Sequence, residues 1–277
     1  VFSSTGYEDG SDLLRDADIA MYRAKELGKG RYAIFDRPMY ERTLNLLKLE
    51  NDLRFGLERR EFVLYYQPII SLTTGKINGF ETLIRWQHPE RGLILPTEFI
   101  PIAEDTGLIV QIGEWLLRES CRQLRNWQLQ FPNAESFKIS VNLASQQIKE
   151  PNLLEKLEQV LSDSGLDGNF LRLEITESML MDWGETTIDT LSKIKERKIQ
   201  LSIDDFGTGY SSLSYLHRFP IDTLKIDRSF VRQMSCDRDN FEIVQTIITL
   251  AHALQIDVIA EGVETIAQFD RLKTLGC

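Results

Sequence analysis

The sequence predicts an α/β protein built on a TIM-like (β/α)8 barrel, and the order of its segments is the first observation that supports this fold. From Glu61 onward, short apolar segments with strand character alternate with amphipathic segments such as 153–164 and 186–197. Such alternation implies parallel strands joined by right-handed crossovers. We count seven candidate strands: Phe62–Ile70, Phe80–Trp86, Phe137–Leu143, Leu171–Thr176, Leu201–Asp205, Thr223–Asp227 and Asp257–Gly262.

The alternation of side chains within each strand is the second observation. Leu171, Leu173 and Ile175 share one parity, whereas Arg172 and Glu174 share the other. An open doubly wound sheet, which is the alternative fold, has helices on both faces and favours continuous apolar runs. In a barrel one parity faces the helices and the other faces the lumen, so alternation is permitted. We therefore expect a barrel in which the last polar residue of each strand converges at the C-terminal mouth.

The segments before the barrel have helical character. Residues 11–29 have apolar positions at helical spacing, with Ser11 placed to cap the helix, and residues 31–35 are expected to form a short strand. Residues 38–60 are amphipathic and are expected to form a helical linker. The expected organisation is therefore the C-terminal remnant of a preceding domain over residues 1–37, a helical linker over 38–60 and the barrel over 61–277.

The number of strands leads to an expectation about the barrel's closure. A closed barrel has no free strand edges, whereas seven strands leave 62–70 and 257–262 without a shared partner. We therefore expect a gap between these two strands beside Glu261. We also expect the natural polypeptide to continue past Cys277 with an eighth strand.

Composition excludes several classes of function. The net charge of −10 and the pI of about 5.0 argue against binding of polymeric nucleic acid, which requires clustered Lys and Arg. Cys121, Cys236 and Cys277 form no CxxC pair, so neither a disulfide framework nor structural zinc is indicated, and a reducing cytoplasm is expected. No apolar run reaches the ~18 residues of a membrane-spanning helix, so no membrane contact is expected from this segment.

Seven polar residues are predicted to meet at the barrel mouth: Glu81, Asn142, Glu174, Asp204, Asp205, Lys225 and Glu261. Five of them are carboxylates, whose mutual repulsion in one low-dielectric pocket would cost several kcal/mol unless cations are bound. All-oxygen ligands suit Mg²⁺ or Mn²⁺ rather than zinc. The adjacent Asp204 and Asp205 are suited to bridging two ions, an arrangement used for attack at phosphorus.

Other residues near the predicted mouth are open to two interpretations. Lys225 can balance charge or orient water, and its alternative role as a Schiff-base amine would require an apolar pocket. The glycine-rich turn at 205–212 can hold a phosphate through its N–H groups and hydroxyls, but glycine is also required there by loop geometry alone. Arg85, on the same parity as Glu81 and Leu83, is a candidate phosphate or guanine contact.

These residues lie within an ordered set of motifs: YYQPI (65–69), ETLIRW (81–86), SVNLA (140–144), LEITES (173–178), IDDFGTGYSSL (203–213), LKIDRSF (224–230) and IAEGVE (259–264). Together they resemble the EAL family of phosphodiesterases over roughly residues 60–277. Seven motifs in the same order make this resemblance specific. It implies a barrel enzyme that opens cyclic di-GMP to linear pGpG with two Mg²⁺ or Mn²⁺ ions.

The resemblance also implies roles for individual residues. The ligands of one ion would be Glu81, Asn142, Glu174 and Asp204, and the ligands or close neighbours of the second would be Asp204, Asp205 and Glu261. Lys225 would position the attacking water, and Glu177 would steady the DDFGTG loop, so the expected catalytic residues are Glu81, Lys225, Glu177 and Asp205. The expected substrate contacts are Gln67, Arg85, Leu83, Thr208, Tyr210, Ser211 and Glu264.

Two features qualify the family resemblance. The signature triplet reads Glu81-Thr82-Leu83, with Thr82 in place of the usual Ala, but the parity of Thr82 directs it away from the lumen. The family segment expected after Cys277 would hold the eighth strand and a site Gln. The family also implies a homodimer formed near the DDFGTG loop.

Residues 11–36 are similar to the end of a GGDEF diguanylate cyclase domain, without its signature loop. The chain is therefore expected to lack cyclase activity. Two alternatives to the phosphodiesterase are a non-catalytic module that senses cyclic di-GMP and, more remotely, an aldolase- or enolase-like barrel.

Overall fold

The computed structural model describes residues 9–26, 28, 30–181, 185–209, 216, 218–234 and 238–277. These residues fall into two compact units, which are described separately. One unit comprises the chain up to Phe62 together with Trp86–Thr106, and the other comprises Val63–Arg85 together with Gly107–Cys277.

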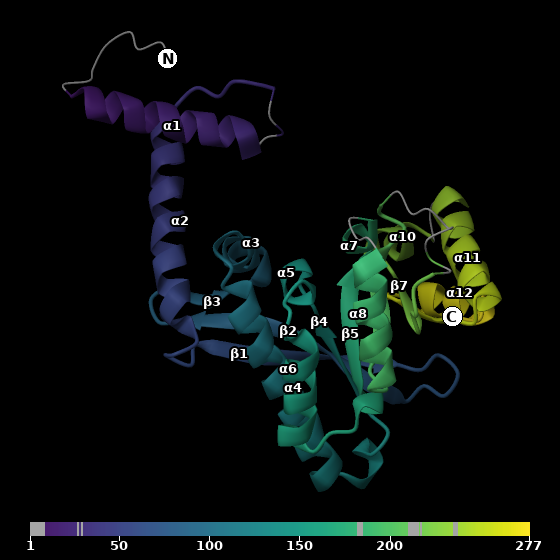
Figure 1. Ribbon diagram of the computed structural model, residues 1–277. Coiled ribbons are helices and arrows are strands. Elements are labelled where there is room, and N and C mark those ends of the chain that lie inside the picture. Colours follow the sequence, from purple (N-terminus) through teal and green to yellow (C-terminus); the bar gives the residue numbers. More distant parts are fainter. Residues whose placement is uncertain are drawn as a thin grey trace. The chain divides into compact units, whose positions relative to one another are not determined.

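The larger unit is a curled sheet with helices along its outer side (Figure 1). Its strands follow the order β1-β2-β4-β5-β6-β7-β8, and each pairing from β2–β4 to β7–β8 is parallel. The strands are β1 Phe62–Ile70, β2 Ile77–His88, β4 Lys138–Asn142, β5 Leu171–Thr176, β6 Gln200–Phe206, β7 Thr223–Ile226 and β8 Asp257–Ala260. The fold is thus the TIM-like barrel architecture that the sequence predicts, and all seven expected strands are present.

Helices cover the side chains on the outer face of the parallel strands. Helix α4 contacts β4, α8 contacts β6, and α11 contacts both β7 and β8. The described helices of this unit are α4 Ile109–Gln130, α5 Ser145–Ile148, α6 Leu153–Ser164, α7 Glu177–Met181, α8 Glu185–Glu196, α10 Arg228–Gln233, α11 Arg238–Ala253 and α12 Ile266–Thr274. The apolar strand residues that they cover, such as Leu173, Ile203 and Leu224, are completely buried. The polar residues of the other parity, such as Glu174 and Lys225, are buried as well, and these two form an ion pair with each other.

The pairing of β1 with β2 departs from the expected parallel pattern. Only residues 71–76 separate the two strands, and the turn is closed by hydrogen bonds from Ser71 N to Lys76 O (2.9 Å) and from Gly75 N to Ser71 O (2.8 Å). Parallel neighbours need a crossover of about a dozen residues, so β1 and β2 form a hairpin.

The two ends of the sheet are β1 and β8, and no pairing joins them within the described residues. Residues of both strands, among them Gln67 and Ile259, line one cavity of about 1000 Å³. The expected gap between the first and the last strand is therefore present, and Glu261 lies on its wall.

The smaller unit contains α1 Gly10–Glu26, α2 Arg37–Gly56, β3 Gly92–Ile94 and α3 Pro96–Thr106. Strand β3, which the sequence did not predict, pairs antiparallel with the end of β2. Phe62, Trp86 and Phe99 pack their rings together, and the Trp86 indole donates a hydrogen bond to Glu61 Oε2 (2.9 Å).

Two predictions for the first forty residues are wrong. Ser11 lies inside α1, and Asp9 takes the capping role because its Oδ1 accepts a hydrogen bond from the Ser11 N–H (3.0 Å). Residues 31–36 form no strand. Tyr32 and Ile34 are 85% and 76% exposed, so this segment has neither a pairing partner nor a buried face to favour a strand.

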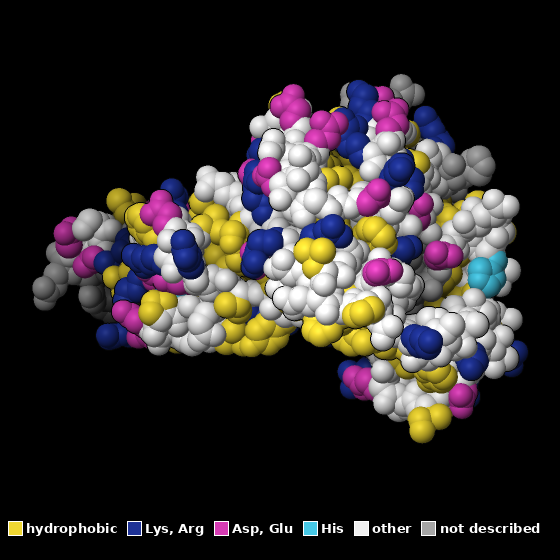
Figure 2. All heavy atoms as spheres, turned by 90° about the horizontal axis from the view of Figure 1, so that it is seen from below, with side chains coloured by type: hydrophobic (Ala, Val, Ile, Leu, Met, Phe, Trp, Pro, Cys, Tyr) yellow, Lys and Arg dark blue, Asp and Glu magenta, His cyan; other side chains and the backbone are white. Residues whose placement is uncertain are grey.

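On the face shown in Figure 2, basic and acidic side chains are interspersed. None of the helices described here is long and apolar enough to cross a membrane.

Candidate active site

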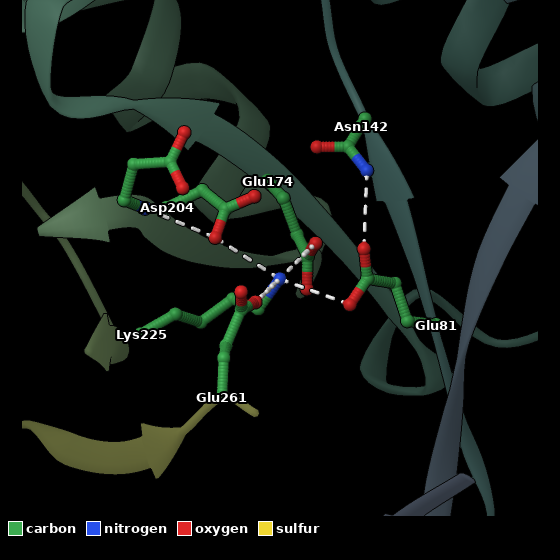
Figure 3. A network of polar contacts seen from close by, with 7 residues as sticks. Glu81, Asn142, Glu174, Asp204, Lys225 and Glu261 are labelled. Atoms are coloured by element: carbon green, nitrogen blue, oxygen red, sulfur yellow. Dashed lines mark hydrogen bonds and ion pairs between the residues drawn. The ribbon is translucent and has the colours of Figure 1, made fainter. Parts of the chain in front are cut away.

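Lys225 lies where the ends of the parallel strands meet (Figure 3). Its Nζ is within ion-pair distance of four carboxylates: 3.0 Å from Glu81 Oε2, 2.8 Å from Glu174 Oε2, 3.1 Å from Asp204 Oδ1 and 2.6 Å from Glu261 Oε1. Asn142 adjoins this group, and its Nδ2 donates a long hydrogen bond to Glu81 Oε1 (3.4 Å). The structure therefore brings together residues from β2, β4, β5, β6 and β7 and the residue that follows β8.

Burial makes it unfavourable for the carboxyl groups of this cluster to be ionised. The side chain of Glu174 is fully buried, and burial, opposed by Lys225, raises its pKa to about 7. Burial likewise raises the pKa of Glu261 to about 7. Each carboxyl is therefore easier to protonate in the folded protein than in water.

The pKa of Lys225 is also raised, but for an amine this shift favours the charged form. Burial opposes its charge, but the surrounding carboxylates outweigh burial and raise the pKa of Lys225. A Schiff-base amine must lose its proton to attack a carbonyl, so this environment contradicts the aldolase-like alternative. Lys225 is instead a permanent cation at the centre of the cluster.

A β-bulge explains how two consecutive aspartates reach one site. Neighbouring strand residues normally point to opposite faces. In the pairing of β6 with β7, Ile203 lies opposite Leu224 and Phe206 opposite Ile226, so two residues of β6 face one residue of β7. At this bulge Asp205 adopts a left-handed backbone with φ of 54°. The irregularity brings Asp204 and Asp205 to the same side, where both approach Glu261.

Sequence reasoning missed one acidic neighbour, Asp227. It lines the same cavity as Asp205 and Glu261, and its carboxylate accepts a hydrogen bond from Ser229 N (2.9 Å) at the start of α10. Burial, followed by the charges of Asp204 and Asp227, raises the pKa of Asp205. The signal for Asp227 was available, because it follows Lys225 at the same strand parity.

Two groups of acids are spaced to hold cations. Oxygens of Glu81, Glu174 and Asp204 lie within 4.8 Å of one another, and the same is true of Asp204, Asp205 and Glu261. Asp204 belongs to both groups. In addition, Glu174 Oε1 is buried without a hydrogen-bond partner among the described residues. A buried, unpaired carboxylate oxygen beside other acids fits a divalent cation such as Mg²⁺ or Mn²⁺.

Glu177 connects this site to the loop after β6. Its Oε2 accepts hydrogen bonds from Gly207 N (2.7 Å) and Gly209 N (3.3 Å). A Cβ added at Gly209 would lie 2.8 Å from Glu177 Oε1, so a larger residue there would displace the Glu177 carboxylate. Thr208 uses its hydroxyl within the loop, donating to Asp205 O (2.8 Å), whereas Tyr210 and Ser211 lie outside the described residues.

Of the remaining predicted substrate contacts, three line the cavity and one does not. Gln67, Leu83 and Glu264 line it. Arg85 is not among the described lining residues. Its guanidinium lies over the Tyr65 ring, 5.4 Å from the ring centroid, and its Nη1 donates to Ile84 O (2.8 Å).

The model of the EAL domain family matches residues 50–277, which include every described strand of the sheet and all the acids described above. The chain belongs to the EAL domain family. The motifs that predicted this membership are thus confirmed.

Relatives with assigned names include two proteins of Pseudomonas aeruginosa. The bifunctional diguanylate cyclase/cyclic di-GMP phosphodiesterase MucR is 44% identical over 266 residues, covering 96% of this chain and 38% of MucR. The cyclic di-GMP phosphodiesterase NbdA is 39% identical over 270 residues, covering 98% of this chain and 34% of NbdA. The chain thus spans little more than a third of these relatives.

A solved structure gives the same result for the fold. The c-di-GMP complex of the PaMucR phosphodiesterase superposes with a TM-score of 0.79 at 45% identity, covering 83% of this chain and 92% of that one. The fold is therefore shared with that EAL domain.

Proposed function

We propose that this EAL domain is a metal-dependent phosphodiesterase that hydrolyses cyclic di-GMP to linear pGpG. The observation that carries the proposal is the pair of acidic groups that share Asp204 at the barrel mouth. Relatives named as cyclic di-GMP phosphodiesterases, at 39–44% identity across the barrel, support the choice of substrate. In the reaction, water adds to phosphorus, the bond to one ribose 3′ oxygen breaks, and that oxygen receives a proton.

The residues that would hold two Mg²⁺ or Mn²⁺ ions follow from the two groups. Glu81, Asn142, Glu174 and Asp204 would hold one, and Asp204, Asp205 and Glu261 would hold or adjoin the other. Bound divalent cations would supply Lewis acidity toward phosphate oxygens and lower the pKa of water. The chain contributes fixed acids from separate strands, so little reorganisation is required when substrate arrives.

The other site residues position these groups. Lys225 holds four carboxylates in place and would orient the attacking water through its N–H donors. Glu177 fixes the loop after β6 by accepting the N–H groups of Gly207 and Gly209. Among the proposed substrate contacts, Gln67, Leu83 and Glu264 lie on the cavity wall. Arg85 and the loop residues Thr208, Tyr210 and Ser211 complete this set.

The proposal also covers the segments that precede the barrel, the oligomeric state and the location of the protein. Residues 1–37 would be the end of a GGDEF domain, and 38–60 would link it to the barrel. The match to bifunctional MucR covers 96% of this chain and supports this arrangement. A homodimer near the DDFGTG loop and a cytoplasmic location complete the proposal.

Turnover in the presence and absence of cation tests the central part. The full natural polypeptide, freed of metal by chelator, is incubated with cyclic di-GMP, and the products are separated by chromatography. We expect pGpG to appear when Mg²⁺ or Mn²⁺ is restored and to stay absent in excess chelator. Ca²⁺ should inhibit, because it prefers longer bonds and more ligands. Binding of cyclic di-GMP without any turnover would instead favour the non-catalytic sensor.

A further inference from the structure

The position of Lys225 has a consequence for cation binding that goes beyond a role in positioning water. Its side chain is 1% exposed, and its ammonium contacts Glu81, Glu174, Asp204 and Glu261 at 2.6–3.1 Å. Figure 3 shows these carboxylates directed at the same nitrogen from different strands. The ammonium therefore occupies the point at which the negative charge of the site is concentrated.

The same acids make up the two groups that can hold cations. Of the five acids in those groups, four form ion pairs with Lys225, and Asp205 alone does not among the described residues. Glu174 uses one oxygen for Lys225 and leaves the other without a hydrogen-bond partner within the described part of the chain. An incoming cation would thus meet carboxylates that are already engaged by a positive charge.

The formal charges show how Lys225 should affect cation binding. The five acids carry five formal negative charges, and Lys225 cancels one of them. Two divalent cations would neutralise the remainder. Like charges at a few ångströms repel by about 1 kcal/mol or more even in water, and by more where water is excluded. Lys225 therefore stabilises the carboxylates when no cation is bound and opposes each cation that enters.

We propose that Lys225 is a built-in counter-ion that holds the metal-free site together and competes with divalent cations for its carboxylates. Its presence sets cation affinity below the value that the acids alone would give. The inference rests on the proposed function only in taking this cluster as the cation site. It also explains how a cluster of acids with raised proton affinity can fold before any cation binds.

Lys225→Met tests the proposal, because methionine keeps an unbranched apolar chain and removes the charge. Lys195→Met is the matched control, since Lys195 forms an equally close ion pair with Asp222 (2.5 Å) that lies outside the acidic groups. Binding of Mn²⁺ is measured by calorimetry and by electron paramagnetic resonance, in the absence of substrate. Unfolding of the metal-free proteins is followed by circular dichroism.

We expect Lys225→Met to bind Mn²⁺ at least about tenfold more tightly than the wild type, a change equivalent to ~1.4 kcal/mol. Its metal-free form should unfold at lower temperature. Lys195→Met should lose thermal stability without a change in Mn²⁺ affinity. If metal-free Lys225→Met does not fold, Mn²⁺ should restore its circular dichroism at concentrations below the wild-type Kd.

Equal or weaker Mn²⁺ binding by Lys225→Met would overturn the counter-ion proposal and leave the phosphodiesterase proposal intact. Failure of Mn²⁺ to restore an unfolded Lys225→Met would overturn it as well. Absence of Mn²⁺ binding by both the wild type and Lys225→Met would overturn the counter-ion proposal together with the metal dependence of the proposed function.

Discussion

The two faces of the parallel strands differ in what they contribute. On the outer face, the apolar residues are completely buried against helices: Ile139, Val141, Leu173, Ile175, Leu201, Ile203, Leu224 and Ile226. On the inner face, the same strands carry Asn142, Glu174, Asp204 and Lys225 near their C-terminal ends. Alternation at a period of two separates these roles within one segment. The outer face stabilises the barrel, whereas the inner face concentrates charge at a cost to stability.

The cost on the inner face follows from the pKa shifts. Burial raises the pKa of Glu174 and of Glu261 to about 7, so ionising either one in the folded protein is less favourable than in the unfolded chain. Lys225 offsets part of that cost. A site with these properties is retained for its chemistry rather than for the stability of the fold.

The largest effect should come from removing an inner-face acid. Asp204→Ala and Glu81→Ala should each lower turnover of cyclic di-GMP by about a thousandfold or more, because each loses a cation ligand. The fold should survive, since fewer acids repel one another. Turnover and circular dichroism of the two variants measure both expectations.

Asp189→Ala is the control for these variants, because Asp189 is an exposed acid paired with Lys193 on α8. It should leave turnover unchanged. Near wild-type turnover in Asp204→Ala or Glu81→Ala would show that the inner face does not carry the chemistry.

Shortening an apolar side chain on the outer face should have the opposite effect, lowering stability while turnover is kept. Ile203 is adjacent to Asp204 in the sequence but faces the helices. Ile203→Ala would create a cavity beneath them and should lower the free energy of unfolding by about 2–5 kcal/mol. The folded fraction should keep most of its turnover. Urea unfolding together with turnover per folded molecule provides the measurement, and loss of turnover beyond loss of folded protein would contradict the separation of the faces.

The pH dependence of stability sharpens the comparison. In excess chelator, Glu174 and Glu261 bind protons more tightly when folded than when unfolded, so the folded state holds the extra protons between about pH 4.5 and 7. Their contribution should therefore make the free energy of unfolding fall as the pH rises through this window, by up to about 3 kcal/mol for each group. Glu261→Gln should reduce the slope, whereas Ile203→Ala should lower stability without changing it. An unchanged slope in Glu261→Gln would contradict the assigned shift.

The smallest effect concerns the backbone at the bulge. Asp205 has a positive φ, which costs a side chain other than glycine or asparagine roughly 1 kcal/mol. Asp205→Gly should therefore be about 1 kcal/mol more stable to urea than Asp205→Ala, although both lose the carboxylate. Equal stability of the two variants would indicate that the left-handed conformation carries no strain.

Much of this arrangement is predictable because it depends on periodicity. Leu173 and Glu174 are adjacent in the sequence, and a strand must place them on opposite faces. Parallel strands end at the same edge, so Glu174, Asp204 and Lys225 had to converge once the strands were identified. Asp227 follows Lys225 at the same parity and lies at the same edge for the same reason.

The features that could not be predicted depend on local energies or on non-local contacts. The bulge at Asp205 is a two-against-one pairing with β7, which no pattern within β6 encodes. Strand β3 exists because it can pair with the end of β2, whereas residues 31–36 have strand-like composition but no partner. That the ammonium of Lys225 reaches four carboxylates is likewise a result of three-dimensional packing. Tyr210 and Ser211 remain predictions.

The measurement that most directly tests the account is a paired one on Glu174→Gln. Glutamine keeps the shape of Glu174 and an acceptor for Lys225, but it removes a fully buried charge. At pH 8 in chelator, the account predicts an unfolding free energy at or above that of the wild type. With Mn²⁺ restored, it predicts loss of cyclic di-GMP turnover in the same preparation. A less stable Glu174→Gln that still hydrolyses cyclic di-GMP would contradict the claim that the inner face trades stability for catalysis.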